Sequence, residues 1–225
     1  METSLHRQLK EHYAADATLR EVSLAGYRID AIQGKRLIEI QHGSLAAIRD
    51  KIAVLLGTHS VTVVKPIVAT KQLVKLDKQG GIEVSRRLSP KRRGVLDLFE
   101  ELVYFTRVFP HKRLTLEVVL VEVEELRYPG HGRRRRRREN DFQIADQRLL
   151  GIVETHRFRT LGDLRRLLPA ELPTTFHTGH LATAMKIPRG IAQRITYCLR
   201  ETGGVRVVGK EGNAILYRYT RRAAA

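Results

Sequence analysis

A glycine-centred turn between two alternating runs constrains the fold of this chain more than any other feature. Residues 26–41 place Gly34-Lys35 between two stretches in which apolar and polar residues alternate. Glycine at the first central position favours a two-residue type II′ turn, and such a turn closes a β-hairpin. A hairpin that closes there brings Asp30 directly opposite Glu39.

The hairpin predicts one polar face that carries both acids. Side chains alternate along a strand, so Asp30, Glu39 and Gln41 share a face. The opposite face carries side chains expected in the core, namely Tyr27, Ile29, Ile38 and Ile40. Like charges directly opposite each other destabilise a sheet, so we expect a cation between the two acids.

Two kinds of cation suit that position, and the residue types leave both open. In an ordinary ion-pair cluster, Arg28, Arg36 or Lys51 neutralises the carboxylates. The alternative is a divalent metal, because two carboxylates on paired strands supply hard oxygen ligands and leave positions for water. Mg²⁺ is usually held in that way. Such an ion activates water and stabilises the charge that develops on a phosphate.

The net charge of the chain points to a polyanionic partner. Its 41 Lys and Arg residues exceed its 24 Asp and Glu residues, which gives a net charge of +17. Residues 139–225 are densely basic, with 14 cationic and 8 acidic side chains. A surplus of this size favours nucleic acid as the partner. The alternatives are a basic protein without such a partner and an anionic membrane surface.

The sequence carries no sign of secretion or membrane insertion. Cys198 is the single cysteine, which excludes an internal disulfide and a cysteine-based metal site. The start, Met-Glu-Thr-Ser-Leu-His-Arg, does not resemble a signal peptide. No apolar run approaches the roughly 18 residues that span a bilayer. We therefore expect a cytoplasmic, intracellular protein with no membrane partner.

The order of the predicted elements indicates two domains of different kinds. Residues 1–128 alternate between helical and strand patterns, which predicts an α/β domain with a mixed sheet flanked by helices. Residues 129–140 break all periodicity and are expected to form an arginine-rich linker. Residues 141–225 predict a helix at 146–154, three short helices and a β-hairpin, which suggests a smaller winged helix-turn-helix domain.

The first region resembles the PD-(D/E)XK nuclease superfamily, whose fold is that of restriction endonucleases. The signature of that superfamily is an Asp followed on the next strand by Asp or Glu, any residue, and Lys. Asp30 matches the first acid, Glu39 matches the second, and Gln41 stands where the Lys is expected. The resemblance covers about residues 4–70, and its motifs are short.

This resemblance implies a metal-dependent nuclease site. Asp30, Glu39 and the carbonyl oxygen of Ile40 would hold Mg²⁺ or Mn²⁺, and a metal-bound water would attack a phosphodiester. Asp30, Glu39 and Gln41 would be the catalytic residues. Gln41 can orient a water molecule but brings no positive charge to the transition state.

Other side chains could complete such a site. Lys51 or Lys65 could supply the missing charge, and a solvated lysine is the simpler interpretation of each. Some members of the superfamily add a Glu from the first helix. Glu11 is nearest by position, although it lies almost opposite the predicted apolar stripe of that helix, and Glu21 is a competing candidate.

The second region resembles winged-helix DNA-binding domains. Residues 189–201 correspond to the recognition helix. Exposed positions there and at the wing tip are expected to meet phosphates and base edges: Arg189, Gln193, Arg194, Tyr197, Lys210 and Asn213. The alternative is a winged helix that binds a protein.

A run of six arginines is a further candidate for nucleic-acid binding. Its members are Arg133, Arg134, Arg135, Arg136, Arg137 and Arg138. Neighbouring cations of this kind release several counterions when they bind DNA or RNA. A solvated linker is the simpler interpretation, and both can hold at once.

Together these patterns predict a DNA-binding protein with a Mg²⁺-dependent phosphodiester-cleaving site. The alternative is a non-catalytic nucleic-acid-binding regulator or adaptor on a degenerate nuclease core, and Gln41 in the lysine position favours it. A third hypothesis is an adaptor that docks a partner protein. The sequence is compatible with a homodimer.

Overall fold

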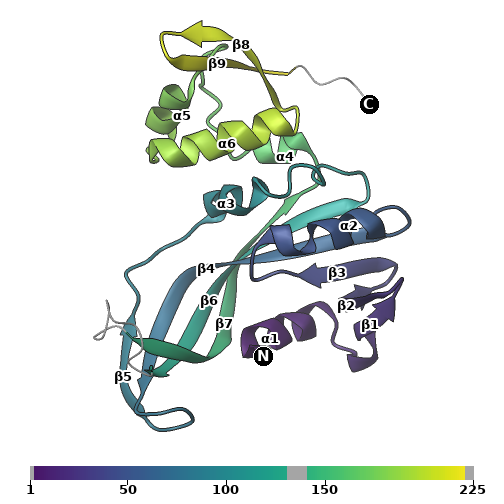
Figure 1. Ribbon diagram of the computed structural model, residues 1–225, viewed down its shortest axis with the longest axis vertical. Coiled ribbons are helices and arrows are strands. Elements are labelled where there is room, and N and C mark those ends of the chain that lie inside the picture. The colour runs from purple at the N-terminus through teal and green to yellow at the C-terminus, as the bar shows by residue number, and fades with distance from the viewer. Residues whose placement is uncertain (1–2, 131–140, 221–225) are drawn as a thin grey trace. The chain divides into compact units, whose positions relative to one another are not determined.

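The computed structural model describes residues 3–130 and 141–220. It has a mixed α/β arrangement with a large sheet flanked by helices, as the sequence predicts (Figure 1). The strand order is β1-β2-β3-β4-β6-β7, and β5 pairs with β4. The strands are β1 (Arg20–Leu24), β2 (Tyr27–Gln33), β3 (Arg36–Ile40), β4 (Ser60–Leu76), β5 (Glu83–Leu88), β6 (Leu114–Pro129) and β7 (Phe142–Phe158).

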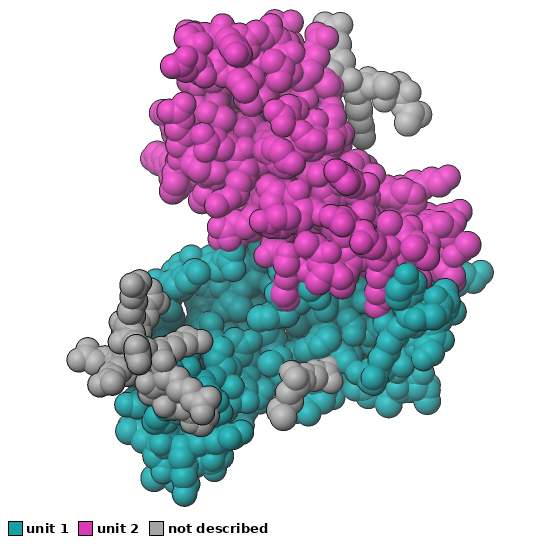
Figure 2. Space-filling model, in the orientation of Figure 1, with its two compact units in different colours: residues 1–42, 64–95, 118–156 teal, residues 43–63, 96–117, 157–225 magenta. Residues whose placement is uncertain are grey.

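The chain divides into two compact units, which are coloured separately in Figure 2. The first unit comprises residues 1–42, 64–95 and 118–156, and the second comprises residues 43–63, 96–117 and 157–225. Each unit therefore gathers segments that lie far apart in the sequence. Among the described helices, none is both long enough and apolar enough to cross a bilayer.

Helix α1 (Ser4–Tyr13) covers the sheet of the first unit with its apolar stripe. The helix begins after Thr3, whose hydroxyl accepts the N–H of His6 and so caps the first turn. Leu5 and Leu9 recur at helical spacing and are fully buried. They belong to one core cluster with residues of β2, β3, β4 and β6: Ala31, Ile38, Ile40, Val64, Val119, Val121 and Val123. This packing holds α1 against the β2–β3 hairpin.

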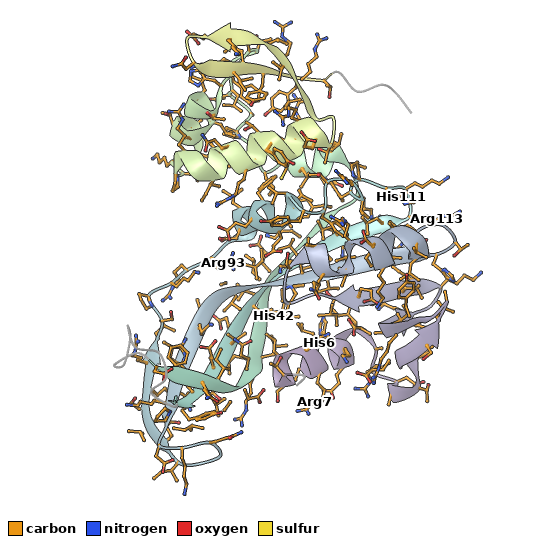
Figure 3. The ribbon with its side chains drawn as sticks, viewed as in Figure 1. His6, Arg7, His42, Arg93, His111 and Arg113 are labelled. Carbon is orange, nitrogen blue, oxygen red and sulfur yellow. The ribbon has the colours of Figure 1, made fainter. Side chains whose placement is uncertain are left out.

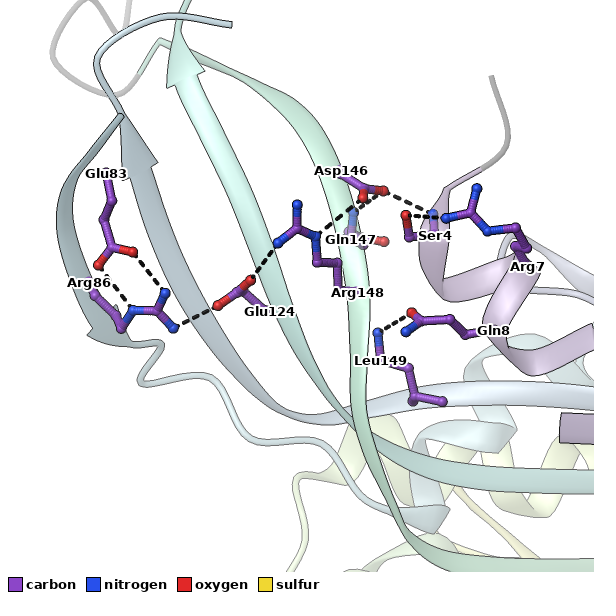
Figure 4. Close-up of polar contacts among 10 residues, drawn as sticks. All are labelled: Ser4, Arg7, Gln8, Glu83, Arg86, Glu124, Asp146, Gln147, Arg148 and Leu149. Carbon is purple, nitrogen blue, oxygen red and sulfur yellow. Dashed lines mark hydrogen bonds and ion pairs between the residues drawn. The ribbon is translucent and has the colours of Figure 1, made fainter. Parts of the chain in front are cut away.

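Hydrogen bonds also tie α1 to β7, although the two elements lie at opposite ends of the first unit's sequence. The N–H of Ser4 donates to Oδ1 of Asp146 at 2.9 Å, and the N–H of Leu149 donates to Oε1 of Gln8 at 2.8 Å (Figure 4). Asp146 thereby satisfies a backbone donor in the first turn of α1. Partial burial raises the pKa of Asp146, but the hydrogen bonds from Ser4 and Gln147 and the charge of Arg148 together lower that pKa overall.

A row of ion pairs continues from Asp146 across three strands (Figure 4). Arg148 on β7 lies 3.7 Å from Asp146 and 3.6 Å from Glu124 on β6. Arg86 on β5 lies 2.6 Å from Glu124 and 2.8 Å from Glu83. Glu124 is 8% exposed, and the two arginines balance its buried charge.

The neighbouring Glu125 is buried more deeply and is surrounded by donors. It is 1% exposed and accepts hydrogen bonds from Lys71 on β4, from Arg127 on β6 and, at 2.7 Å, from Gln147 on β7. Burial raises the pKa of Glu125, but these hydrogen bonds and the charge of Lys71 lower it overall. The carboxylate therefore links three strands of the sheet.

Residues 146–154 form part of strand β7, so the predicted helix there is wrong. The sequence also assigns this segment to a C-terminal domain at 141–225, whereas the structure places β7 beside β6 in the large sheet. Gln147 to Leu150 have good helix propensity, but pairing with β6 and contacts with α1 override that weak preference.

The second unit contains the remaining helices and a separate hairpin. Its helices are α2 (Arg49–Leu55), α3 (Leu98–Leu102), α4 (Leu161–Arg165), α5 (Thr178–Met185) and α6 (Arg189–Glu201), and its hairpin is β8 (Val205–Glu211) with β9 (Ala214–Tyr219). From residue 160 onward these elements follow the predicted order of three short helices and a hairpin.

Helix caps define the short helices of this unit. Thr160 and Asp163 form a reciprocal capping box at the start of α4. At the start of α5, Nδ1 of His177 accepts the N–H groups of Gly179 at 3.0 Å and His180 at 3.2 Å. Lys186 adopts a left-handed conformation with φ 52° and ends α5 just before α6 begins.

Helix α6 packs its apolar side inward, against α3 among other elements. Ile195, Cys198 and Leu199 are at most 1% exposed. Sγ of Cys198 lies 4.0 Å from the carbonyl oxygen of Phe99 on α3. Burial raises the pKa of the Cys198 thiol to about 12, as expected for a cysteine in the core.

Candidate functional site

The β2–β3 hairpin has the register that its turn predicts. Ala31 pairs with Ile38, Ile32 with Leu37, and Gln33 with Arg36. Gly34 has φ 59°, as the first central position of the predicted turn requires. The backbone ladder ends one position before Asp30 and Glu39, which are the next residues along the two strands.

The carboxylate of Asp30 takes the place of the next backbone hydrogen bond between β2 and β3. Its Oδ2 accepts the backbone N–H of Ile40 at 2.8 Å and lies 3.4 Å from Nε2 of His6. Its Oδ1 lies 3.9 Å from Nζ of Lys10. His6, labelled in Figure 3, and Lys10 are one turn apart on α1. The carboxylate is thus held between the backbone of β3 and two basic side chains of α1.

These contacts keep Asp30 ionised. Burial alone raises the pKa of a carboxyl group. Here the hydrogen bonds from His6 and from the Ile40 N–H, together with the charges of His6 and Lys10, outweigh burial and lower the pKa of Asp30 overall. Side chains of α1 therefore balance the negative charge of Asp30.

Lys10 lies between Asp30 and Glu21, although the sequence predicts other cations beside the hairpin acids. Lys10 is 5% exposed and also contacts Glu21 on β1, which pairs with Arg28 as well. A basic side chain therefore does neutralise an acid of the hairpin, but it comes from α1. The one available signal is the spacing of His6 and Lys10, each of which follows a buried leucine of the α1 stripe.

The other residues of the predicted site lie at the end of β3 and on β4. Glu39 is 3% exposed. Gln41 is half-buried, and its backbone N–H donates to the carbonyl of Val64 at 2.9 Å. Lys65 is 5% exposed, and its Nζ donates to the carbonyl of His42 at 3.0 Å. Lys65 thus secures the chain just after β3 and is not a solvated side chain.

Three further residues are candidates for the metal-dependent site, and each lies in other surroundings. Nη1 of Arg20 lies 3.3 Å from Glu11, which is exposed on α1. Glu21 contacts Lys10 and Arg28, as described above. Lys51 lies on α2, in the second unit.

The contacts of Asp30 do not fit a Mg²⁺ site. Mg²⁺ demands an octahedral set of oxygen ligands at about 2.1 Å. One oxygen of Asp30 already accepts an N–H group, and a lysine ammonium lies beside the other. Within residues 3–130 and 141–220, no three or more His, Cys, Asp or Glu side chains are grouped as metal ligands. A metal held by Asp30, Glu39 and Ile40 stays a prediction, and this geometry counts against it.

A second candidate site lies within the second unit, between α6 and the β8–β9 hairpin. A pocket of about 230 Å³ opens there. Four residues that the sequence predicts as nucleic-acid contacts line it: Arg189, Gln193, Tyr197 and Asn213. Arg200 also lines this pocket, and its guanidinium carbon lies 5.5 Å from the centre of the Tyr197 ring. The fold therefore gathers basic, amide and aromatic groups from two separate elements.

The other predicted nucleic-acid contacts have different surroundings. Nη1 of Arg194 lies 3.4 Å from Glu100 on α3, so this arginine already has an acidic partner. Lys210 is exposed on β8. The arginine run 133–138 lies outside the residues that the structure describes.

Comparison with known proteins identifies the family of this chain. Residues 3–159 match the family described as "Domain of unknown function (DUF8091)", so the chain belongs to that family. An uncharacterized protein of Treponema pallidum (strain Nichols) is 29% identical over 219 residues, which cover 96% of this chain and 85% of that protein. No solved structure is significantly similar. The family match ends just after β7, whereas the likeness to the Treponema protein also extends over the helices and hairpin that follow.

Proposed function

We propose that this member of the DUF8091 family is a nucleic-acid-binding protein that uses α6 and the β8–β9 hairpin as a winged-helix reader. The observation that carries this proposal is the pocket between α6 and the hairpin. Arg189, Gln193 and Tyr197 from the helix and Asn213 from the hairpin line it together. Their side chains supply cations for phosphates and amides for base edges.

The amphipathic character of α6 supports its role as the recognition helix. Its inner side is fixed by buried residues such as Ile195 and Leu199, whereas Arg189, Gln193 and Tyr197 are exposed. The left-handed turn at Lys186 joins α5 to α6, as in a helix-turn-helix. The hairpin that follows corresponds to the wing. DNA is the expected partner by the resemblance to winged-helix domains.

The charge of the whole chain supports a polyanionic partner. A net charge of +17 raises the local concentration of nucleic acid through long-range attraction. Binding of this kind weakens steeply as salt rises, because each phosphate contact releases counterions. A winged helix that docks a protein partner predicts a much flatter salt response.

We further propose that Asp30 and Glu39 of the β2–β3 hairpin do not form a catalytic site. The carboxylate of Asp30 is committed to the Ile40 N–H and to His6 and Lys10 of α1. Freeing it for a metal would leave Lys10, which is 5% exposed, with one acidic neighbour fewer. Gln41 stands where the resemblance expects a Lys, and this agrees with a structural role for the hairpin.

The binding half of the proposal is tested with the full-length protein and labelled duplex DNA. Fluorescence anisotropy at increasing salt should give a steep loss of affinity. Arg189→Ala should weaken binding several-fold at fixed salt, because one phosphate contact is lost. Arg194→Ala is the matched control on the same helix and should have a smaller effect, since Arg194 is paired with Glu100. Failure to bind DNA or RNA at low salt would overturn the proposal.

The catalytic half is tested by incubating the protein with DNA and RNA in Mg²⁺ or Mn²⁺. We expect no cleavage above that of an Asp30→Asn variant purified in parallel. Cleavage that depends on both Asp30 and Glu39 would support the metal-dependent nuclease instead. Titration with Mn²⁺ gives a second readout, because a metal site at the hairpin predicts binding that Asp30→Asn abolishes.

A further inference from the structure

A solvent-exposed tyrosine ring lines the pocket between α6 and the hairpin. Tyr197 is 41% exposed and lines the pocket, although most of α6's large apolar residues are buried. Arg200, one turn nearer the end of the helix, lies against the same ring. An exposed aromatic ring with a neighbouring guanidinium is the arrangement on which unpaired bases stack in proteins that bind single strands.

The rest of the wall suits the edge of a base and its phosphate. Gln193 lies one turn before Tyr197 on α6, and Asn213 faces the pocket from the β8–β9 turn. Each amide offers both donors and an acceptor to the hydrogen-bonding edge of a base. Arg189, at the start of α6, supplies a cation at the same pocket.

We propose that this pocket takes an unpaired nucleobase, so that the protein prefers a single-stranded extension or frayed end to the interior of a duplex. The proposal rests on the proposed function and names its substrate class. Inside a duplex both faces of a base are covered by its neighbours, and its pairing edge is occupied. A base must therefore leave the stack before it can lie on Tyr197 and reach the amides of Gln193 and Asn213.

The test compares three ligands with the full-length protein at one salt concentration. They are a blunt duplex, the same duplex with an unpaired extension at one end, and the unpaired strand alone. We expect the wild-type protein to bind the extended duplex about tenfold more tightly than the blunt one, because one stacked base adds a contact that the blunt duplex lacks.

Variants assign that preference to the pocket. Tyr197→Ala should remove the preference, so that the affinities for the extended and the blunt duplex become about equal, whereas Tyr197→Phe should retain it. Arg189→Ala should weaken binding to all three ligands. Tyr104→Ala is the matched control, because Tyr104 is 56% exposed outside the pocket, and it should change nothing.

The outcomes separate this inference from the proposed function. Equal affinity of the wild-type protein for blunt and extended duplexes would overturn the inference and leave nucleic-acid binding intact. A uniform loss on all ligands in Tyr197→Ala would also overturn it. Absence of binding to any ligand would remove the proposed function itself. The wild-type comparison needs no substitution, so it does not depend on how well a variant folds.

Discussion

Oδ2 of Asp30 accepts the backbone N–H of Ile40 at 2.8 Å, so a side chain stands where β2 would otherwise offer a carbonyl oxygen to β3. The same carboxylate meets Lys10 of α1. A single acid therefore joins two strands and a helix. Its contribution to the protein is measurable as stability, independently of any activity.

Replacing Asp30 with Ala should lower the free energy of unfolding by about 2 kcal/mol at neutral pH, because the Ile40 N–H loses its acceptor and Lys10 loses one acidic neighbour. Asp30→Asn keeps an acceptor and should cost less. Urea unfolding followed by circular dichroism measures both. Asp50→Ala is the control, since the side chain of Asp50 is 86% exposed. An unchanged midpoint for Asp30→Ala would contradict this account.

The stability that Asp30 supplies should depend on pH in a defined direction. The pKa of Asp30 is lower in the folded protein than in the unfolded chain, where it is about 3.9. The folded state then binds fewer protons at this site, so the stabilisation is complete above pH ~4 and is lost as pH falls through the folded pKa. The difference in unfolding free energy between wild type and Asp30→Asn should shrink from pH 7 to pH 3. A constant difference would refute the lowered pKa.

Replacing either of two glutamates on β6, three residues apart, with Ala should lower the free energy of unfolding by very different amounts. Glu125 is 1% exposed and accepts from Lys71, Arg127 and Gln147, so Glu125→Ala should cost about 3 kcal/mol. Glu122 is exposed and accepts a hydrogen bond from the hydroxyl of Thr70 at 2.9 Å, so Glu122→Ala should change little. Chemical denaturation of the two variants side by side measures the contrast, and similar losses would argue against a buried acid as a link between strands.

The cap of α5 makes Gly179 intolerant of a side chain. A Cβ on Gly179 would lie 2.7 Å from Cε1 of His177, whose ring caps the helix. Gly179→Ala should therefore destabilise the protein, and His177→Ala should cost about 1 kcal/mol through loss of the cap. Gly190→Ala, at the second position of α6, is the matched control, because a Cβ there meets nothing within 4 Å. Thermal unfolding should rank Gly190→Ala as the mildest of the three.

Local sequence signals predict several elements of this fold well. Gly34 and the alternation around it predict the hairpin register that pairs Ala31 with Ile38. The segment 189–201 is a helix with the predicted bounds, because its apolar period and the flanking Pro188 and Gly203 are all local. Arg189, Gln193, Tyr197 and Asn213, which the sequence groups as nucleic-acid contacts, line one pocket.

Long-range contacts account for what the sequence does not predict. The residues around Asp146 predict a helix, but Asp146 lies on β7 and its carboxylate accepts the N–H of Ser4, 142 residues away in the sequence. The counter-ion of Asp30 is Lys10, which belongs to a helix two elements earlier in the chain. Nothing in residues 26–41 indicates which distant side chain will cover the hairpin, so those residues alone leave the ion-pair and metal interpretations open.

Strand β7 follows the arginine run in the sequence but pairs with β6, and this affects where the chain can be truncated. The arginine run looks like a natural point of cleavage, yet a cut there would strip β6 of its neighbour and leave two long bare edges prone to intermolecular pairing. A cut after residue 159 keeps the sheet but uncovers the side of α6 that buries Cys198 near Phe99. Both cuts expose surfaces that the intact chain covers, so we expect such truncations to cause misfolding before they reveal a function.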